Sequence, residues 1–375
     1  MKYKLEDICN QIYSGGTPST SHKEYWGGNL PWLSSGETSQ RFIYTTEKYI
    51  TEHGVKNSST KFAKKFSTVM ASAGQGHTRG QTSFLMNDMY VNQSVLVFEP
   101  NTYMVEPLFL FYNLNGRYEE LRQLSDGTST RGSLSGRIVK GMEIDLPNLR
   151  IQKKIVNILY GIDKKIEINT KINRNLSEQV AALYKAWFID FERNDGVCPE
   201  EWKEATLGDI AEIGSGKRPP MKQTDKTDDV CIPLIGAASI MGYTNSVLYD
   251  SKILVTGRVG THGVVQRFNN ECWPSDNTLV ITTDKYEFVN QILLRIDYKS
   301  MNRGSTQPLI TQGDLKKTEI ILPTDAILDE FEALAGGLMN QYEKNILENA
   351  KLSELRDTLL PKLMSGELDV SDMDF

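Results

Sequence analysis

The sequence contains an internal duplication, and this feature limits the possible folds more than any other. Six short blocks occur twice, in the same order along the chain. The clearest matches are 5–8 with 207–210, 92–97 with 276–281, and 143–147 with 319–323. The offset between copies falls from 202 to 184 and then to 176, so the first copy has the longer loops. Such ordered self-similarity predicts two domains with the same topology.

Each copy has the sequence pattern of a mixed α+β domain. Short β-branched runs bounded by Gly, Asn and Asp predict strands at 69–72, 91–98, 252–256, 263–268 and 278–282. Apolar residues at helical spacing predict helices near 106–124 and 286–302. Neither copy alternates strands regularly with long helices, which argues against a doubly wound parallel sheet.

A long helical pattern follows each copy. Apolar residues recur every three or four positions over 151–187 and again over 328–363. A repeat of this length predicts a coiled-coil seam, on which Asn169 and Asn345 would lie and set the register. The simplest packing is antiparallel, with one copy at each end of a rod. The alternative is an amphipathic helix packed on an ordinary globular core.

We therefore expect an α+β protein with a pseudo-twofold internal repeat. Two similar mixed α/β domains are expected to be separated by two long helices that form an antiparallel coiled coil. The expected boundaries are 1–148 for the first domain, 149–196 for the first helix and a linker, 197–323 for the second domain, and 324–375 for the second helix with an acidic tail. Two similar domains that are related by a pseudo-twofold axis and held at a fixed separation can bind a target that has an approximate twofold axis of its own, such as duplex DNA.

The charge distribution permits nucleic-acid binding without arguing for it. The chain has 42 basic and 48 acidic residues, a net charge of -6, and 12 of the acidic residues lie in 324–375 against only 4 basic ones. The two copies are therefore nearly neutral, and their cations could still cluster on one face. A duplicated scaffold that binds protein or glycan instead of DNA remains an alternative. The acidic tail is expected to be a solvated terminus.

Cysteine and histidine usage argues against structural metals and disulfides. The four cysteines lie far apart with no C-x-x-C pair, which points to the reducing cytoplasm. The four histidines form no H-E-x-x-H, and no metal site is expected. No run of apolar residues is long enough to suggest a membrane span.

A self-sufficient enzyme, either a DNA methyltransferase or a nuclease, is the rival class. An amino-methyltransferase should show N-P-P-Y or D-P-P-Y, and neither tetrapeptide occurs. The run 201–203 has the E-x-K letters of a nuclease, but no P-D precedes it. The glycine-containing turns 14–17 and 214–217 lack the spacing of a phosphate-binding loop. We expect no catalytic residue in this chain.

With these features together, the chain resembles the specificity (S) subunits of type I restriction-modification systems. The resemblance rests on Ser-Gly-Gly-Thr-Pro at 14–18, Cys-Pro-Glu-Glu-Trp at 198–202, Ile-Leu-Val-Thr-Gly-Arg-Val-Gly at 253–260, and Leu-Leu-Pro-Lys-Leu-Met-Ser-Gly-Glu at 359–367. It covers essentially the whole chain. The first copy departs from the family pattern at 71–76, where an Arg usually follows the strand.

The resemblance implies a function and a set of partners. Each of two target recognition domains would read one half of a bipartite site in double-stranded DNA through the major groove. The helices would set the spacer length and dock two methyltransferase (M) subunits, and restriction (R) subunits would join them. The chain would be the non-catalytic recognition component of a type I restriction endonuclease and adenine-specific DNA methyltransferase complex. It would bind no cofactor, because S-adenosylmethionine, ATP and Mg²⁺ are implied for the partner subunits.

Candidate DNA-contacting residues come from polar loops beside the matched strands. Major-groove readout uses forked donors for guanine and amides for adenine, while small hydroxyls suit phosphates. The candidates in the first copy are Gln75, His77, Arg79, Thr128, Ser129, Thr130 and Arg131. The candidates in the second copy are Lys217, Arg218, Arg258, Thr261, His262, Arg303, Ser305, Thr306 and Gln307. For any one of them, the alternative is a solvated turn residue.

Overall fold

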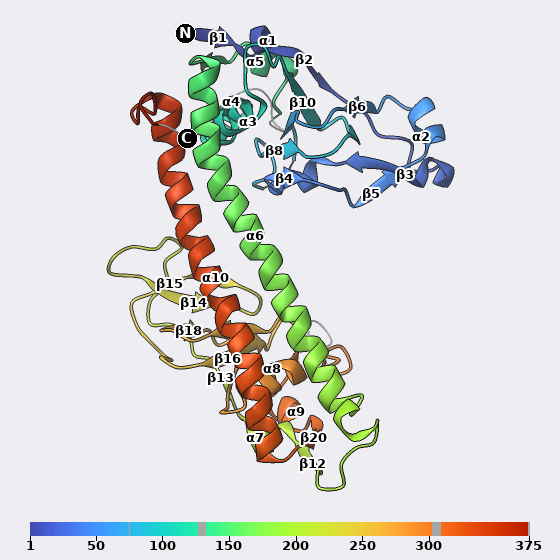
Figure 1. The fold of residues 1–375 in the computed structure, drawn as a ribbon, viewed down its shortest axis with the longest axis vertical. Helices are drawn as coiled ribbons and strands as arrows, with labels where there is room; N and C mark the ends of the chain where they lie inside the picture. The colour runs from blue at the N-terminus through green and yellow to red at the C-terminus, as the bar shows by residue number, and fades with distance from the viewer. Residues whose placement is uncertain (75, 127–132, 302–308, 374–375) are drawn as a thin grey trace. The chain divides into compact units, whose positions relative to one another are not determined.

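The structure is a computed structural model, and it describes residues 1–74, 76–126, 133–301 and 309–373. The chain divides into two compact units. The first unit comprises Met1–Ile168 and Glu348–Phe375, and the second comprises Asn169–Leu347. Each long helix contributes one part to each unit, so the helices belong to both units (Figure 1). The four segments expected from the sequence, with their boundaries, remain a prediction.

The first unit is built on two larger sheets and one strand pair. The five-stranded sheet has the order β2-β10-β7-β8-β4, the four-stranded sheet has the order β5-β3-β9-β6, and β1 pairs with β11. The strands are β1 Lys2–Lys4, β2 Cys9–Ser14, β3 Trp26–Leu33, β4 Phe42–Ile43, β5 Lys48–Ile50, β6 Lys61–Ala63, β7 Thr68–Ala71, β8 Thr82–Leu85, β9 Met89–Val91, β10 Val95–Pro100 and β11 Glu143–Asp145. The helices are α1 Leu5–Ile8, α2 Glu52–Lys56, α3 Pro107–Asn115, α4 Tyr118–Asp126 and α5 Gly136–Lys140, with 3₁₀ turns η1 Lys23–Tyr25 and η2 Ser35–Ser39.

The second unit uses the same plan with fewer strands. Its sheets have the orders β13-β19-β16-β17 and β15-β14-β18, and β12 pairs with β20. The strands are β12 Lys203–Thr206, β13 Glu212–Ser215, β14 Ile232–Ile235, β15 Ile240–Thr244, β16 Ile253–Gly257, β17 Gln266–Phe268, β18 Trp273–Pro274, β19 Thr278–Thr282 and β20 Glu319–Leu322. The helices are α7 Leu207–Ile210, α8 Tyr286–Leu293 and α9 Gln312–Lys316, with a 3₁₀ turn η3 at Glu192–Asn194.

The pairing of the strands confirms the internal repeat. In both units the first strand pairs with the last strand before the long helix, as β1 with β11 and β12 with β20. The central antiparallel strands also correspond, because β10 pairs with β2 and β7 just as β19 pairs with β13 and β16. Each unit has one matching parallel pair, β3 with β9 and β14 with β18. The sheets of the described residues are thus mixed and mainly antiparallel, which agrees with the argument against a doubly wound parallel sheet.

Among the predicted strands and short helices, four differ from the structure by more than one residue. The strand predicted over 263–268 begins only at Gln266. The run 91–98 is not one strand, because Asn92–Ser94 turns between β9 and β10 and the Asn92 Oδ1 accepts the backbone N–H of Ser94 at 3.0 Å. The helix predicted over 106–124 is two helices, α3 and α4, separated at Gly116. The helix predicted over 286–302 stops at Leu293, whose carbonyl accepts the hydroxyl of Tyr298 at 3.0 Å as the chain folds back.

The two long helices, α6 Leu149–Phe188 and α10 Asp325–Ser365, pack against each other within each unit. In the first unit Asp163 of α6 pairs with Arg356 of α10, and the backbone carbonyl of Ile166 accepts from Asn349. In the second unit Asn345 donates to the Oδ1 of Asn173 at 2.8 Å. In both units residues later in α6 contact residues earlier in α10, so the packing is antiparallel, as predicted.

Asparagines lie on the seam of the helices in the second unit. The predicted seam residues Asn169 and Asn345 are 1% and 4% exposed. Asn345 hydrogen-bonds to Asn173, whose own amide donates to the carbonyl of Tyr342 at 3.0 Å. A buried amide pair of this kind disfavours shifted registers, because a shift would leave the amides unpaired.

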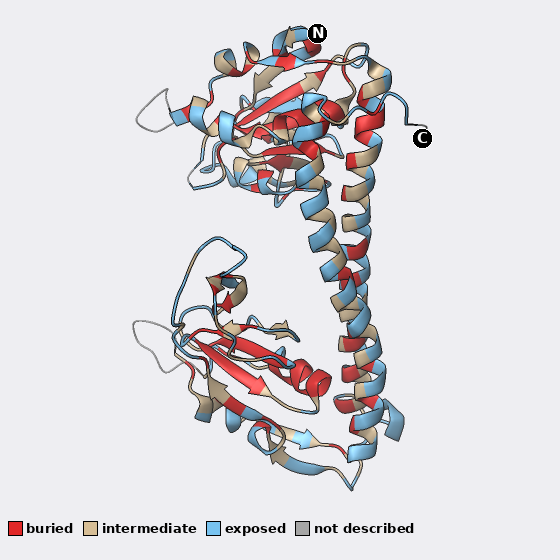
Figure 2. Ribbon diagram, turned by 90° about the vertical axis from the view of Figure 1, so that its left-hand side faces the viewer, coloured by how far each residue is buried: buried red, intermediate tan, exposed pale blue. Residues whose placement is uncertain are grey.

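Each unit has its own apolar core, which joins a sheet to the long helices. In the first unit Phe109 and Phe111 of α3 pack with Phe98 of β10 and Leu159 of α6. In the second unit Phe288 of α8 packs with Tyr184 of α6 and Phe331 of α10, with ring centroids 5.6 and 6.4 Å from that of Phe288. Figure 2 shows the buried residues concentrated on the central strands and on α8. Because aromatic side chains bury large areas, these clusters hold each sheet on its helices.

The end of the chain is more ordered than the sequence suggested. Val370 is 1% exposed and packs with Leu363 in the first core, while the carboxylates of Glu367 and Asp369 stay exposed. The Nζ of Lys154 donates to the backbone carbonyl of Ser371 at 2.7 Å. The acidic side chains Glu367, Asp369 and Asp372 are thus exposed, as expected of a solvated tail, whereas the backbone at Val370 and Ser371 is held against the first unit. Within the described residues, no helix has the length and apolar character that crossing a membrane requires.

Candidate nucleic-acid interface

The first candidate loop, residues 72–81, connects β7 to β8. The two strands form a hairpin, in which the backbone N–H of Ala71 donates to the carbonyl of Gln81 and the N–H of Gly80 donates to the carbonyl of Ala71. Gly76 and Gly80 have φ values of +58° and +88°, a conformation that residues with a side chain rarely adopt. The glycines therefore let the loop turn sharply at the end of a buried hairpin.

Side chains of α4 hold this loop. The Tyr118 hydroxyl donates to the carbonyl of His77 at 2.8 Å, and the Nη1 of Arg122 donates to the carbonyl of Gly76 at 2.8 Å. The guanidinium of Arg79 pairs with the carboxylate of Asp126 and is largely buried. The side chain of His77 is exposed. Of the two described candidates in this loop, His77 is thus open to a ligand, whereas Arg79 is engaged within the unit.

The second candidate loop, residues 258–265, connects β16 to β17 and is held by main-chain hydrogen bonds. The N–H of Arg258 donates to the carbonyl of Asn277 at 2.8 Å, and the carbonyl of Arg258 accepts from the N–H of Ile310 at 3.0 Å. A Cβ on Gly257 would lie 1.9 Å from the carbonyl oxygen of Thr261, so only glycine fits at this position. The backbone of Arg258 is therefore fixed on both sides.

The other candidates of this loop differ in accessibility. Thr261 is exposed, while His262 is half-buried with its Nδ1 3.1 Å from the carbonyl of Gly257. The Nε2 of His262 is buried and has no hydrogen-bond partner among the described residues. The Nδ1 of His262 therefore contacts the loop itself, while its Nε2 makes no hydrogen bond within the described residues.

Two further candidates follow β13. Lys217 and Arg218 are exposed, and the main chain of Lys217 is pinned because its N–H donates to Pro274 at 3.0 Å and its carbonyl accepts from the Nε1 of Trp273 at 2.8 Å. A Cβ on the preceding Gly216 would lie 2.2 Å from the carbonyl of Ser275. Gly214 and Ser215 lie in β13, so the tight turn predicted at 214–217 was wrong; Gly216 instead lets the chain pass close to the backbone of Ser275, and two cations follow on a main chain held by hydrogen bonds.

The remaining candidates cannot be assessed from the structure. They lie outside the described residues and are Gln75, Thr128, Ser129, Thr130, Arg131, Arg303, Ser305, Thr306 and Gln307.

A polar pocket in the first unit adjoins the first loop. Its volume is about 340 Å³, and its lining includes His77 and Gln81 from the loop, Arg41 from the segment before β4, and Asn115 and Tyr118 from the α3–α4 segment. The Nη1 of Arg41 donates to the Oδ1 of Asn115 at 2.8 Å. Sequence reasoning did not single out these partners of the loop. No local signal marked them, because they come from segments brought together only by the fold.

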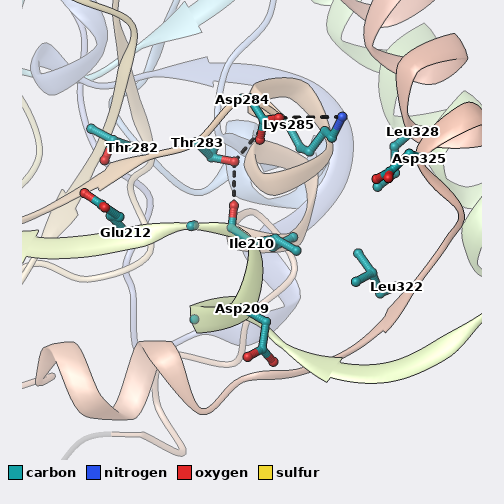
Figure 3. Close-up of a pocket in the computed structure, with 12 residues that line it drawn as sticks. Asp209, Ile210, Glu212, Thr282, Thr283, Asp284, Lys285, Leu322, Asp325 and Leu328 are labelled. Atoms are coloured by element: carbon teal, nitrogen blue, oxygen red, sulfur yellow. Dashed lines mark hydrogen bonds and ion pairs between the residues drawn. The ribbon is translucent and has the colours of Figure 1, made fainter.

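A different pocket, in the second unit, is unsuited to DNA. It has a volume of about 550 Å³, and Figure 3 shows Asp209, Glu212, Asp284 and Asp325 around it together with Lys285. These carboxylates would repel phosphates. The Nζ of Lys285 lies 2.7 Å from a carboxylate oxygen of Asp329, which takes up its charge. Among the described residues, no three His, Cys, Asp or Glu side chains are placed to hold a metal ion.

Comparisons with known proteins agree with one another. A family model described as Type I restriction modification DNA specificity domain matches residues 1–178 and 199–356. The chain is 29% identical over 413 residues to the Type I restriction enzyme MjaIX specificity subunit of Methanocaldococcus jannaschii, covering 99% of this chain and 94% of that protein. It is 24% identical over 386 residues to the HindI specificity subunit of Haemophilus influenzae, covering 77% and 84%.

The fold also has a counterpart among solved structures. The crystal structure of a type I restriction-modification S subunit from M. genitalium superposes with a TM-score of 0.61 at 16% identity. The match covers 97% of this chain and 96% of that one. At this level of identity the likeness concerns the fold alone.

Proposed function

The chain belongs to the type I restriction modification DNA specificity family, and from this premise we propose that each of its two units reads one half of a bipartite site in double-stranded DNA. The chain is the DNA specificity subunit of a type I restriction-modification system. The proposal concerns how it divides the recognition between its two units. We assign the first half-site to residues 1–148 and the second to residues 197–323.

The observation that carries the proposal is a pair of corresponding hairpin loops. The loop after β7 and the loop after β16 follow matching buried strands, and each has a conformationally restricted glycine near its start, Gly74 in the first and Gly257 in the second. Exposed His77 belongs to one loop and exposed Thr261 to the other. Rigid elements that present polar side chains on tight loops are the arrangement that reading base edges requires.

We further propose the DNA-contacting residues of each unit. In the first unit, His77 reads base edges together with residues 128–131 and Gln75. Arg79, which pairs with Asp126, contributes to the same DNA contact from its buried position in the loop. In the second unit, Lys217 and Arg218 contact phosphates, since exposed flexible cations suit positioning rather than base readout. Arg258, on its pinned backbone, reads bases with Thr261 and His262, and residues 303–307 complete the contact.

The same premise extends to partners. We propose that the helices set the spacer length and dock two methyltransferase (M) subunits, and that restriction (R) subunits join the complex. This chain would then catalyse nothing by itself and bind no cofactor. S-adenosylmethionine, ATP and Mg²⁺ would belong to the partner subunits. The assembly would work in the cytoplasm, as the isolated cysteines suggest.

Methylation mapping tests the division of labour. DNA from cells that carry this chain with its methyltransferase partner should show one interrupted methylated motif. Exchanging residues 1–148 for those of another specificity subunit should change one half of that motif and leave the other half intact. A change in both halves, or in neither, would overturn the proposal.

Salt dependence separates DNA recognition from the alternative of a protein or glycan scaffold. The affinity of the assembled complex for its methylation target should fall by at least ~10³-fold between 50 and 200 mM salt, since phosphate contacts release counterions. A scaffold that binds another ligand would show little change over this range.

A further inference from the structure

One face of α4 contacts the first candidate loop at three successive turns. Tyr118, Arg122 and Asp126 are spaced four residues apart and therefore lie on one side of the helix. Tyr118 and Arg122 donate to the carbonyls of His77 and Gly76, both at 2.8 Å, and Asp126 pairs with Arg79. All three side chains thus act on the short segment 76–79.

The adjoining side of α4 is anchored in the core. Leu121 is fully buried and belongs to the apolar core of the first unit. A Cβ on Gly80 would lie 3.4 Å from the Cβ of Leu121, so the loop backbone packs directly on the helix. The helix is therefore anchored in the core through Leu121, and the neighbouring side chains and Leu121 itself contact the loop, so the loop is held against a fixed helix.

The hydrogen bonds from Tyr118 and Arg122 to the loop leave the side chain of His77 exposed to solvent. Tyr118 and Arg122 bond only to main-chain carbonyls of the loop, so they use no side chain that could read a base. His77 stays exposed while its own carbonyl is held. A side chain on a fixed backbone loses less conformational freedom on binding, which strengthens discrimination between bases.

We propose that α4 is a brace for the recognition loop of the first unit, and that Tyr118 and Arg122 are positioning residues for base selection in the first half-site. The inference rests on the proposed function, because it takes loop 72–81 to contact DNA. It predicts that weakening the brace relaxes the choice of bases in one half-site and spares the other.

The second unit gives the reason to expect such a one-sided effect. Its corresponding loop is held by the main-chain bonds of Arg258 to Asn277 and Ile310, and the first loop has counterparts of these bonds, from the N–H of Ser72 to Ser94 and from the N–H of Leu134 to the carbonyl of Ser72. The side-chain bonds from Tyr118 and Arg122 are added to this support in the first unit, to which α4 belongs. A variant of α4 therefore alters the support of only one of the two loops.

The test is methylation mapping in cells that express the full system with Arg122→Ala or Tyr118→Phe. Tyr118→Phe changes no charge and keeps the ring, so any effect reports the lost hydrogen bond. We expect Arg122→Ala to raise methylation at sites with one wrong base in the first half-site by ~10-fold, which is the order of discrimination that one well-placed base contact provides. Tyr118→Phe should have a smaller effect in the same direction. Methylation at sites mismatched in the second half-site should stay within ~2-fold.

Arg117→Ala is the matched control. Arg117 also lies at the start of this segment, but it donates to Glu120 and to the carbonyl of Glu143 and not to the loop. Its loss should leave both half-sites unchanged. Arg122→Lys, which keeps a donor and the charge, should restore most of the discrimination. Equal melting temperatures of Arg122→Ala and Arg117→Ala would separate positioning from a general loss of stability.

Two outcomes would overturn the brace, for different reasons. If His77→Ala relaxes the first half-site but Arg122→Ala and Tyr118→Phe do not, the loop reads DNA without help from α4. If His77→Ala and both α4 variants leave the motif unchanged, loop 72–81 does not read DNA, and the residues assigned under the proposed function fail with it.

Discussion

The first unit joins its sheet to the long helices around a buried carboxylate, whereas the second unit does so around a buried guanidinium. In the first, Asp163 of α6 is 3% exposed and accepts from Arg356 at 2.8 Å and from Arg41 at 3.3 Å. The hydroxyl of Tyr112 donates to it at 2.7 Å. One acid is thus shared between two arginines and a tyrosine.

In the second unit the signs are reversed. The Nη1 and Nη2 of Arg267 in β17 donate to both carboxylate oxygens of Glu287 at 2.6 and 2.7 Å. The Nη2 also donates to Glu343 of α10 at 3.1 Å. Burial alone would lower the pKa of the Arg267 guanidinium, but the hydrogen bond and charge of Glu287 outweigh it and the pKa is raised. Arg267 therefore stays charged and linked to two acids.

The comparison shows that both units bury a charged contact between the sheet region and a long helix, but that they build it from different residues on different elements. In each unit a charged group next to the sheet meets one on a long helix, although the central charge has changed sign. Buried ion pairs of this kind cost little only when every partner is present. The number of remaining partners therefore decides how each unit responds when one is removed.

The largest effect is expected from Asp163→Ala. The substitution leaves the guanidinium groups of Arg41 and Arg356 without their shared carboxylate, and breaking a buried pair in this way costs about 3–5 kcal/mol. Chemical denaturation of the purified chain would measure the loss. A cost below about 1 kcal/mol would show that the carboxylate is not what holds the first unit to its helices.

A smaller effect is expected from Glu343→Ala in the second unit. Arg267 keeps its two hydrogen bonds to Glu287, so only one charged hydrogen bond to it and the one from Asn269 are lost. We expect a loss of about 1.5–3 kcal/mol, less than for Asp163→Ala under the same conditions. Glu354→Ala, at an exposed position of α10, is the control and should change stability by less than about 0.5 kcal/mol. The comparison between the units is tested by whether Asp163→Ala lowers stability more than Glu343→Ala does, and not by the size of either loss.

The hydrogen bond between Asn345 and Asn173 on the helix seam of the second unit involves no charge, so its loss should cost less than the loss of either charged contact. Asn345→Leu leaves the Oδ1 of Asn173 without its donor and should cost about 1–2 kcal/mol. Replacing both asparagines by Leu should be nearly neutral, because an unpaired buried amide is then no longer left behind. Denaturation of the two single variants and the double variant gives the coupling energy. Additive losses would show that the two amides do not act as a pair.

The smallest effect concerns the buried thiols, one in each unit. Burial raises the pKa of Cys9 to about 12 and that of Cys272 to about 11. In the folded chain both thiols stay protonated at pH 9, so a thiol reagent should modify exposed Cys198 and spare Cys9 and Cys272. Mass spectrometry of the labelled peptides would show this. Rapid native-state labelling of Cys9 alone would indicate that the first unit opens locally.

The same shifts set a direction for stability at high pH. A raised pKa means that the folded state holds the proton more tightly than the unfolded state does. This contribution is complete below the unfolded thiol pKa of about 8.5 and is lost as pH rises toward the folded value. Stability should therefore fall above about pH 8.5, and Cys9→Ala should reduce that dependence more than Cys272→Ala, because its shift is larger.

The candidate interface was only partly accessible to sequence reasoning. The glycines at 74–80 and 257–263 marked two loops, and the structure places them after matching strands. The sequence could not distinguish exposed His77 from buried Arg79, because Arg79 pairs with Asp126, which is 47 residues away, and only the fold brings the two together. Arg122 carried no signal at all, since its role comes from where α4 packs.

Local periodicity determined the repeat, the strand-rich domains and both long helices, because each is encoded by residues a few positions apart. The tertiary structure alone decided that Asp163 meets Arg41 and Arg356, which are 122 and 193 residues from it. The contact of Asp163 with Arg356 depends on the register of α6 against α10, and its contact with Arg41 depends on the path of the segment before β4. No local pattern encodes that register, because a shift of one helical turn would leave the apolar spacing of each helix unchanged and bring different charges together.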